Sequence, residues 1–248
     1  MRLDVIELQE FYSGSELGRT TKELINRVLG EKIETGAGSL TIGFGFACPF
    51  LENKFTEREN KDFLLLMPSE QGVISWPEKS KSVSALVDEV SWPVNTSSAD
   101  LILISHGLEV SDNQDLLLQE VLRVLKDSGK LVIIVPNRTG FWARSDSTPF
   151  GYGKPYSISQ LTALLQKNQF QIDSITPSLY GFPAKRGYWL KSLLLWEKVG
   201  EKLNSFFLGG ILVVEAKKNV FAVKNVKSAK PGRYFTSVEV PVSTMSRA

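Results

Sequence analysis

Short apolar runs alternate along this chain with segments whose apolar residues recur at helical spacing. The clearest runs, at 62–67, 99–105 and 130–136, are rich in Leu, Ile and Val, as strands buried on both faces are. Alternating strands and helices predict a doubly wound α/β domain, with a mostly parallel seven-stranded sheet between two layers of helices. The seven predicted strands are 39–43, 62–67, 82–90, 99–105, 130–136, 170–176 and 210–217.

Helices are predicted between these runs from apolar spacing and from end signals. The N-terminal 3–27 stretch predicts one or two helices with a break near Ser13-Gly14, and Ser157 with Gln160 forms a capping-box pattern. Pro and Gly crowd the stretch after 62–67, so the crossover helix there is predicted to be short or absent. The other predicted helices are 49–57, 112–126, 157–168 and 188–205.

The length of 248 residues suits one domain with additions. We place a single domain at 1–221, followed by a basic tail at 222–248 that is predicted to be disordered. Within the domain we distinguish N-terminal helices at 1–35, a long loop at 137–156 and a helical insert at 180–208. The insert has apolar and basic faces, so it either packs on the sheet or lies on a membrane surface or a lipid-like substrate.

A glycine-rich turn follows the first predicted strand, and we call residues 43–47 (Gly-Phe-Gly-Phe-Ala) the glycine turn. In a doubly wound sheet, ligands bind beyond the carboxyl ends of the strands, so a ligand crevice is predicted here. The turn fits a nicotinamide dinucleotide fingerprint poorly, because its last position falls on Cys48 and the second strand ends without the ribose-binding acid.

Four parts of the chain resemble class I S-adenosylmethionine-dependent methyltransferases, in particular the branch called methyltransferase type 11. They are SLTIGFGFA at 39–47, ALVDEVSWPVNTSSADLILISHGLEV at 85–110, LLQEVLRVLKDSGKLVIIVPN at 117–137, and the seventh predicted strand near the C-terminus. The third is the most specific, with Arg123, Leu125, Gly129 and Lys130 in place. The resemblance implies a Rossmann-like methyltransferase fold, S-adenosylmethionine as cofactor, and methyl transfer to an unknown substrate.

The resemblance also assigns cofactor positions along the chain. The glycine turn would line the methionine and ribose part, the end of the second strand the ribose and adenine, and two acids the adenine amine. The position after the fourth strand would face the methyl group. These cofactor-binding candidates are Gly43, Phe44, Gly45, Phe46, Ala47, Met67, Pro68, Asp88, Glu89 and Ser105.

Three positions depart from the family pattern. Thr41 replaces an acid, Ala47 replaces the third glycine, and Met67-Pro68 replaces the carboxylate that usually binds the ribose. A second hypothesis therefore stands beside the enzyme: a methyltransferase-fold protein without catalysis that acts as a binding or regulatory module, at a membrane surface or on RNA.

His106, the only histidine of the chain, follows the fourth strand and is the candidate catalytic base, although a role in loop packing is the alternative. The long loop is longer than ordinary connections and is predicted to be a lid or substrate loop. Its aromatic and basic residues either contact the substrate or anchor the loop. The substrate candidates are Asn137, Arg138, Phe141, Trp142 and Tyr152.

Composition bears on metal binding, on cellular location and on contact with membranes. One Cys and one His cannot form a metal cluster, so no metal is expected. A single Cys also favours the cytoplasm, and no apolar run is long enough to span a membrane. The 217–248 segment holds seven Lys or Arg and one acidic residue, so weak contact with an anionic surface is the alternative to a solvated tail.

Overall fold

The computed structural model describes residues 2–56, 62–78, 81–183, 197, 200 and 209–219. The tail predicted at 222–248 lies outside the described residues. So do the helix predicted at 188–205, apart from two positions, and most of the predicted insert.

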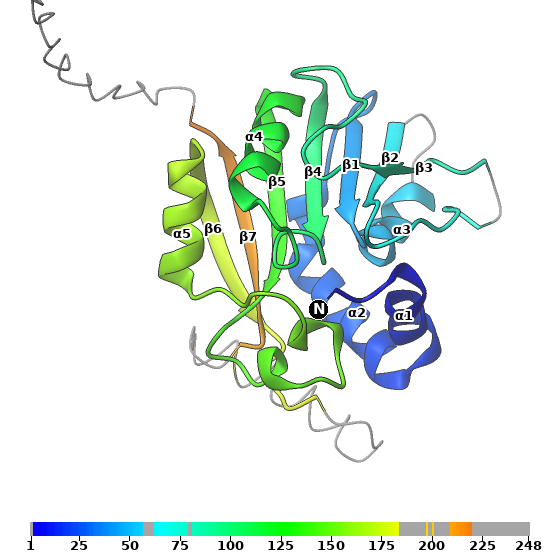
Figure 1. The fold of residues 1–248 in the computed structure, drawn as a ribbon, viewed down its shortest axis with the longest axis vertical. Coiled ribbons are helices and arrows are strands. Elements are labelled where there is room, and N and C mark those ends of the chain that lie inside the picture. The colour runs from blue at the N-terminus through cyan, green and yellow to red at the C-terminus, as the bar shows by residue number, and fades with distance from the viewer. Residues whose placement is uncertain are drawn as a thin grey trace, which may run out of the picture.

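A seven-stranded sheet forms the centre of the molecule (Figure 1), with the strand order β3-β2-β1-β4-β5-β7-β6. The neighbours from β3 to β5 pair in parallel, whereas β7 runs antiparallel to both β5 and β6. The predicted mostly parallel sheet is therefore confirmed. The strands are β1 (Leu40–Gly45), β2 (Asp62–Pro68), β3 (Ser84–Val87), β4 (Ala99–Ser105), β5 (Leu125–Pro136), β6 (Phe170–Ser178) and β7 (Ile211–Lys218).

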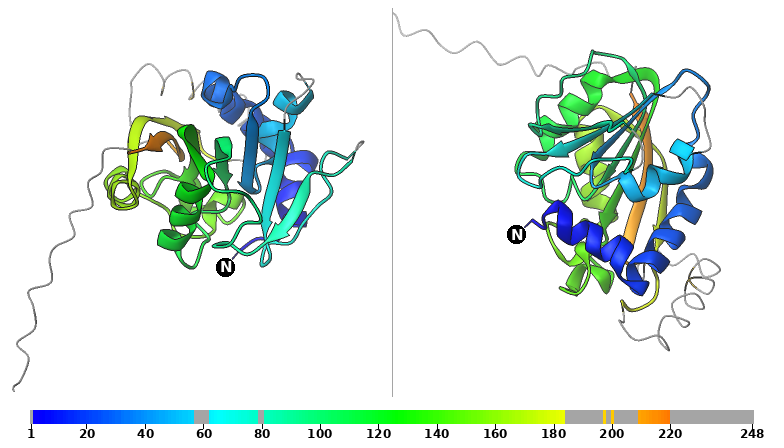
Figure 2. Two further views of the ribbon diagram at one scale, coloured as in Figure 1. Left: turned by 90° about the horizontal axis from the view of Figure 1, so that it is seen from above. Right: turned by 90° about the vertical axis from the view of Figure 1, so that its right-hand side faces the viewer.

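Helices cover both faces of the sheet and complete three layers (Figure 2). One face carries the N-terminal helices and α3, and the other carries α4 and α5. Successive strand residues point to opposite faces: Leu103 of β4 joins the first core and Ile104 joins the second. The helices are α1 (Val5–Gln9), the π-helical η1 (Glu10–Gly14), α2 (Glu16–Leu29), α3 (Cys48–Thr56), α4 (Gln114–Val124) and α5 (Ile158–Lys167).

Side-chain caps begin several of the helices. Ser157 and Gln160 form the predicted capping box at α5. A second capping box, from Asp4 and Glu7, begins α1. The N-terminal helix ends its π-helical turn at Gly14, and Ser15 then caps α2 by accepting from the Gly18 amide. The predicted break near Ser13-Gly14 is confirmed.

The connection from β2 to β3 contains no helix in its described parts, 69–78 and 81–83. This agrees with the prediction from its Pro and Gly residues. Strand β3 is shorter than the predicted 82–90, because Asp88 leaves the ladder and forms a turn with Ser91. Within the described residues, no helix is long and apolar enough to cross a membrane.

Candidate functional site

The glycine turn lies where β1 ends, directly beside the end of β4. Gly45 has φ +75°, and a Cβ on it would lie 2.4 Å from the Ser105 carbonyl oxygen. The Phe46 amide donates to that same carbonyl over 2.7 Å. Glycine is therefore required at position 45 by backbone conformation and by the close approach of β4.

Residues 2–14, which we call the N-terminal segment, lie across this end of the sheet (Figure 1). The Val5 amide donates to the Gln71 carbonyl over 2.8 Å, just beyond β2. A Cβ on Gly72 would lie 3.3 Å from the Val5 side chain. The N-terminal segment thus packs directly on the loop that follows β2.

Tyr12 is the part of this segment that reaches the glycine turn. Its ring stacks on Phe46 with centroids 6.0 Å apart, and Phe50 meets it edge-on at 5.5 Å. Its hydroxyl lies 2.7 Å from Nε2 of His106. Because Tyr12 is 2% exposed, its side chain fills the space between the glycine turn and His106.

Arg2 fills the neighbouring part of the crevice, over the loop after β3. Its guanidinium forms an ion pair and hydrogen bond with Glu89 and a second ion pair with Glu70 at 3.3 Å. It also donates to the Val110 carbonyl over 2.8 Å. Ser111 donates its hydroxyl to Glu89 over 2.9 Å. A cation of the chain itself therefore pairs with one of the two acids that the family resemblance assigns to the adenine amine.

Several buried polar atoms at the strand ends have no hydrogen bond within the described residues: Ser105 Oγ, Gln71 Oε1 and both carboxylate oxygens of Glu109. Gln71 does donate its amide to the His106 carbonyl over 3.1 Å. Buried polar atoms without partners are uncommon in folded proteins and often mark functional sites. Their concentration here supports a polar site under the N-terminal segment.

A cavity of about 830 Å³ opens beside this crevice. Tyr12 and Phe46 line it, together with Cys48 of α3 and Trp76 of the loop after β2. Of the predicted cofactor residues, Phe46 is the one that lines this cavity. Tyr12 contacts His106 on one side and the cavity on the other, so it separates the crevice from the open space.

The remaining predicted cofactor residues lie around the same end of the sheet. Met67 is buried in the core on the side of the N-terminal helices, and Pro68 pairs with Val87. Asp88 accepts from the Val90 amide over 2.9 Å, as part of its own turn. Gly43, Phe44 and Ala47 are buried within β1 and the glycine turn. The carboxyl end of β2, at Met67-Pro68, carries no carboxylate, as the sequence indicated.

Side chains of the long loop pack against neighbouring parts of the chain. Asn137 donates its side-chain amide to the Gly209 carbonyl, and Trp142 donates its indole N–H to the Gly181 carbonyl, each over 2.7 Å. Both side chains are buried. Phe150 of the same loop lies against the His106 ring, with centroids 4.9 Å apart. The loop therefore forms one wall of the site.

The other predicted substrate residues lie nearer the surface of the loop. Arg138 donates to the Pro155 carbonyl, and the Tyr152 hydroxyl donates to the Asp146 carbonyl. Phe141 stacks on Phe182 with centroids 3.9 Å apart and stays partly exposed. Within the described residues, none of these contacts reaches the glycine turn.

Sequence reasoning did not identify four of the residues that make this site: Arg2, Tyr12, Gln71 and Glu109. The spacing of Glu109, three residues after His106, was the one available signal. The other three come from segments far away in sequence, so their proximity depends on the tertiary fold. Within the described residues, no group of three or more Cys, His, Asp or Glu could hold a metal ion.

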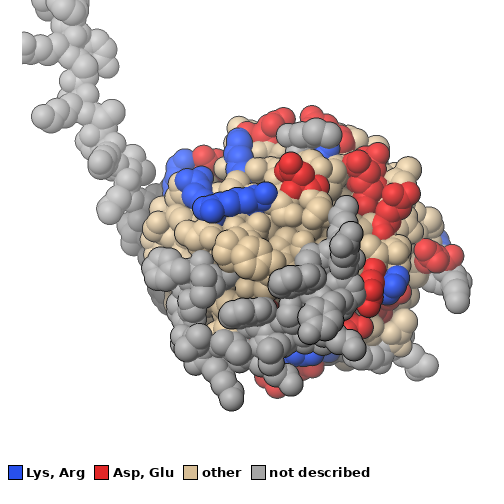
Figure 3. Space-filling model, turned by 90° about the horizontal axis from the view of Figure 1, so that it is seen from below, with Lys and Arg blue, Asp and Glu red and all other residues tan. Residues whose placement is uncertain are grey.

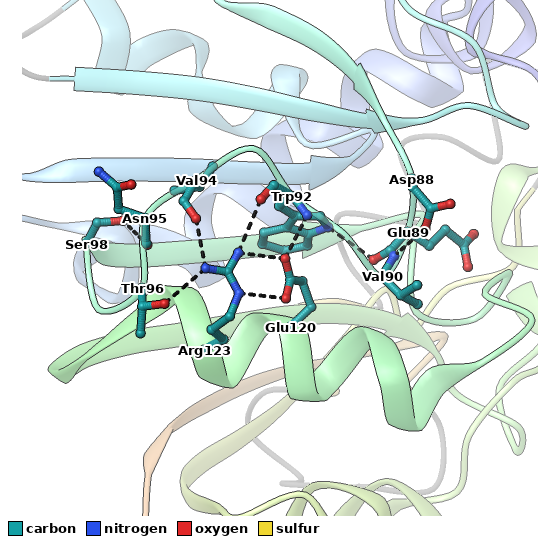
Figure 4. Close-up of polar contacts among 10 residues, drawn as sticks. All are labelled: Asp88, Glu89, Val90, Trp92, Val94, Asn95, Thr96, Ser98, Glu120 and Arg123. Carbon is teal, nitrogen blue, oxygen red and sulfur yellow. Dashed lines mark hydrogen bonds and ion pairs between the residues drawn. The ribbon is translucent and has the colours of Figure 1, made fainter.

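The most specific passage of the family resemblance has a structural role (Figure 4). Arg123 on α4 donates to both carboxylate oxygens of Glu120 over 2.7 and 2.8 Å. It also donates to the carbonyls of Trp92 and Val94 and to the Thr96 hydroxyl. The Arg123 guanidinium thus fixes the loop before β4 against α4, and Trp92 in turn stacks on Phe44 of β1.

Figure 3 views the molecule from below, at the end of the sheet that carries the N-terminal segment and the long loop. Acidic side chains gather on the right of this view, and the basic side chains lie mainly on the left.

Cys48, at the start of α3, is buried, and this burial raises the pKa of its thiol. A buried thiol of this kind is inert as a nucleophile.

Comparison with known families identifies the part of the chain that builds this end of the sheet. Residues 41–133 match the model of the methyltransferase domain, type 11. Over these residues the chain is similar to that methyltransferase family. The match covers β1 to β5, and hence both the glycine turn and the Arg123 contacts. No protein of curated function matches the chain by sequence.

Solved structures of SAM-dependent methyltransferases share the fold. One from Thermotoga maritima aligns with a TM-score of 0.64 at 15% identity, covering 86% of this chain and 95% of that one. One from Archaeoglobus fulgidus aligns with a TM-score of 0.57 at 21% identity, covering 86% and 99%. Geranyl diphosphate C-methyltransferase from Streptomyces coelicolor, solved with S-adenosylhomocysteine, aligns at 0.55 and 12% identity, covering 81% of each chain. The predicted methyltransferase fold is confirmed.

Proposed function

We propose that this protein transfers a methyl group from S-adenosylmethionine to a substrate. The observation that carries the proposal is the glycine turn, held at the ends of β1 and β4 within the part of the chain that matches the methyltransferase domain. Bound there, the cofactor would supply an electrophilic methyl group on its sulfonium. The chain would supply position and exclusion of water.

The residues present fit such a cofactor in part. Glu89 offers a carboxylate for an amine, and Ser105 and Gln71 offer buried polar atoms without hydrogen bonds in the described chain. Arg2 and Tyr12 fill the same crevice. We therefore infer that the N-terminal segment moves when the cofactor binds, with Arg2 leaving Glu89 and Tyr12 leaving His106.

The second candidate is a methyltransferase-fold protein without catalysis, acting as a binding or regulatory module. The Met67-Pro68 end of β2, which has no carboxylate, favours it, because a ribose would lose charge-assisted hydrogen bonds worth about 1.5–3 kcal/mol. The buried packing of Tyr12 also favours it.

Isothermal titration calorimetry with S-adenosylhomocysteine separates the two. The full chain should bind one equivalent with a Kd below about 1 mM. Tyr12→Ala, which joins the crevice to the neighbouring cavity, should bind about tenfold more tightly, because less closed structure has to open. Lys167→Ala is the control, since Lys167 forms an exposed ion pair on the opposite face of the sheet. Absence of binding to both the full chain and Tyr12→Ala would leave the inactive module as the function.

We further propose a cytoplasmic location, supported by the single cysteine. The proposed domain remains 1–221, with the basic 222–248 tail outside it. Contact of the 217–248 segment with anionic surfaces is a proposal that rests on its excess of Lys and Arg.

A further inference from the structure

A buried carboxylate lies next to His106 that the proposed cofactor site does not use. Glu109 is 1% exposed, and neither of its oxygens has a hydrogen bond within the described residues. Oε1 of Glu109 forms an ion-pair contact with Nδ1 of His106, 3.3 Å away. A buried carboxylate without a partner is costly. The Glu109 carboxylate is therefore stabilised by Nδ1 of His106.

His106 is held in an unusual conformation between two polar groups. Its φ is +50°, a left-handed value that is strained for a residue other than glycine and is often found at functional sites. Nδ1 faces Glu109, Nε2 faces the Tyr12 hydroxyl 2.7 Å away, and Phe150 packs on the ring. The imidazole is thus fixed at both nitrogens.

The chemistry of the two neighbours decides which nitrogen carries the proton. Oε1 of Glu109 faces Nδ1 at 3.3 Å, and a carboxylate oxygen accepts, which favours the tautomer with the ring proton on Nδ1. In that tautomer Nε2 accepts from the Tyr12 hydroxyl 2.7 Å away, whose pKa is raised by burial and by the nearby Glu109 carboxylate. Nε2 is therefore a lone-pair acceptor that receives a hydroxyl group, which is the arrangement of a general base with an alcohol.

We infer that the Tyr12 hydroxyl occupies the position of the methyl acceptor, and that the acceptor is a phenolic hydroxyl whose proton passes to Nε2 of His106. Glu109 is the positioning residue that fixes the His106 tautomer. The planar ring of the acceptor would replace the Tyr12 ring over Phe46 and against Phe50. This inference rests on the proposed function.

The reaction balances with the named groups alone. With the cofactor bound, the bond between its sulfur and the methyl carbon would break as a bond between the acceptor oxygen and that carbon forms. The acceptor proton would move to His106 Nε2, and S-adenosylhomocysteine would leave with the electron pair of the broken bond. Solvent then takes the proton from the imidazolium after the site opens.

The first test reads the tautomer directly, because the chain has a single histidine and its imidazole nitrogen signals need no assignment. Proton–nitrogen spectra of the unliganded protein should show the Nδ1–H tautomer. Glu109→Gln keeps a side-chain oxygen that can accept, so it should retain this tautomer, whereas Glu109→Leu should lose it. An Nε2–H tautomer in the wild-type protein would overturn the inference without any variant having to fold.

The second test removes the Tyr12 side chain by mutation and supplies the same phenol group as a small molecule in solution. In Tyr12→Gly, added p-cresol should shift the His106 signals and, with S-adenosylmethionine, be converted to 4-methylanisole. Toluene, which lacks the hydroxyl, is the control ligand, and wild-type protein with p-cresol is the control for the cavity. Glu109→Leu in the Tyr12→Gly background should lower the rate of ether formation about 100-fold.

The outcomes separate this inference from the proposed function. If S-adenosylhomocysteine and p-cresol both bind to Tyr12→Gly but no ether forms, the acceptor role of this position is wrong while the cofactor site stands. If S-adenosylhomocysteine binds to neither Tyr12→Gly nor the full chain, the proposed function itself is wrong, and the acceptor role falls with it.

Discussion

Single residues at the strand ends combine backbone strain with close packing. Gly45 ends β1 and His106 directly follows β4, the strand that pairs with β1, and both residues have positive φ. At Gly45 the strain is relieved because glycine has no Cβ. At His106 it is retained, and the ring is held by Tyr12 and Phe150. The strained backbone at position 106 therefore helps to hold the imidazole in place.

Gly45→Ala tests the packing at the glycine turn. The new methyl group would meet the Ser105 carbonyl oxygen at 2.4 Å in a conformation that disfavours side chains. We expect a loss of about 2–4 kcal/mol in the free energy of unfolding, measured by urea denaturation. Gly36→Ala is the matched control, because a Cβ there has no neighbour within 4 Å, and it should change stability by less than about 0.5 kcal/mol. Equal effects at the two glycines would contradict the geometry.

At the scale of elements, α1 is too short to be stable alone, so its caps and contacts decide whether it stays on the site. Its five residues begin at the capping box of Asp4 and Glu7. Their main attachments are the Val5 amide on Gln71 and the buried side chains of Val5 and Leu8. This small set of contacts is consistent with the opening inferred for the N-terminal segment.

Asp4→Ala should make this segment open more often. Loss of an N-cap costs about 1 kcal/mol, so amide hydrogen exchange in residues 5–12 should accelerate roughly fivefold. Ser157→Ala removes the corresponding cap from α5 and should leave exchange in residues 5–12 unchanged. Unchanged exchange in Asp4→Ala would mean that other contacts alone hold α1 in place.

The passage around α4 gives a prediction with a defined pH dependence. The Arg123 hydrogen bonds lower the pKa of Glu120, so this pair stabilises the fold above the ordinary Glu pKa of about 4.5 and loses its effect as the pH falls through the lowered value. Arg123→Ala should therefore reduce the free energy of unfolding by about 1–2 kcal/mol at pH 7.

The difference between Arg123→Ala and the wild-type protein should shrink as the pH is lowered from 7 toward about 3, because Glu120 becomes protonated in both. Urea titrations at several pH values measure it. Lys167→Ala removes an exposed ion pair and is expected to cost about 0–0.5 kcal/mol. A constant difference across this range would show that Arg123 acts through its carbonyl contacts rather than through Glu120.

At the scale of the whole molecule, the strand order places the glycine turn and His106 side by side. β1 pairs with β2 on one side and β4 on the other, so three loops meet at one edge. The N-terminal segment and the long loop close over that edge from opposite sides (Figure 1). The site therefore consists of parts separated by more than a hundred residues.

The charge distribution along the chain predicts the behaviour of the C-terminal tail. Removal of residues 222–248 should leave the Tm of the domain within about 2 °C, because we place the domain at 1–221. It should also lower co-sedimentation with liposomes of anionic phosphatidylserine, since most of the basic residues of 217–248 are removed. Undiminished co-sedimentation would assign any membrane contact to another part of the chain.

Local sequence patterns were sufficient to predict the alternation of strands and helices, the capping box at α5, the break before α2 and the position of the glycine turn. Each follows from local rules of burial, capping and backbone freedom that act over a few neighbouring residues. Tertiary structure alone decided that Tyr12 lies on His106, that Arg2 pairs with Glu89 and that Glu109 is buried without a hydrogen bond in the described chain. Those contacts depend on how the N-terminal segment folds back across the sheet. No pattern among neighbouring residues predicts a contact between positions so far apart in the sequence.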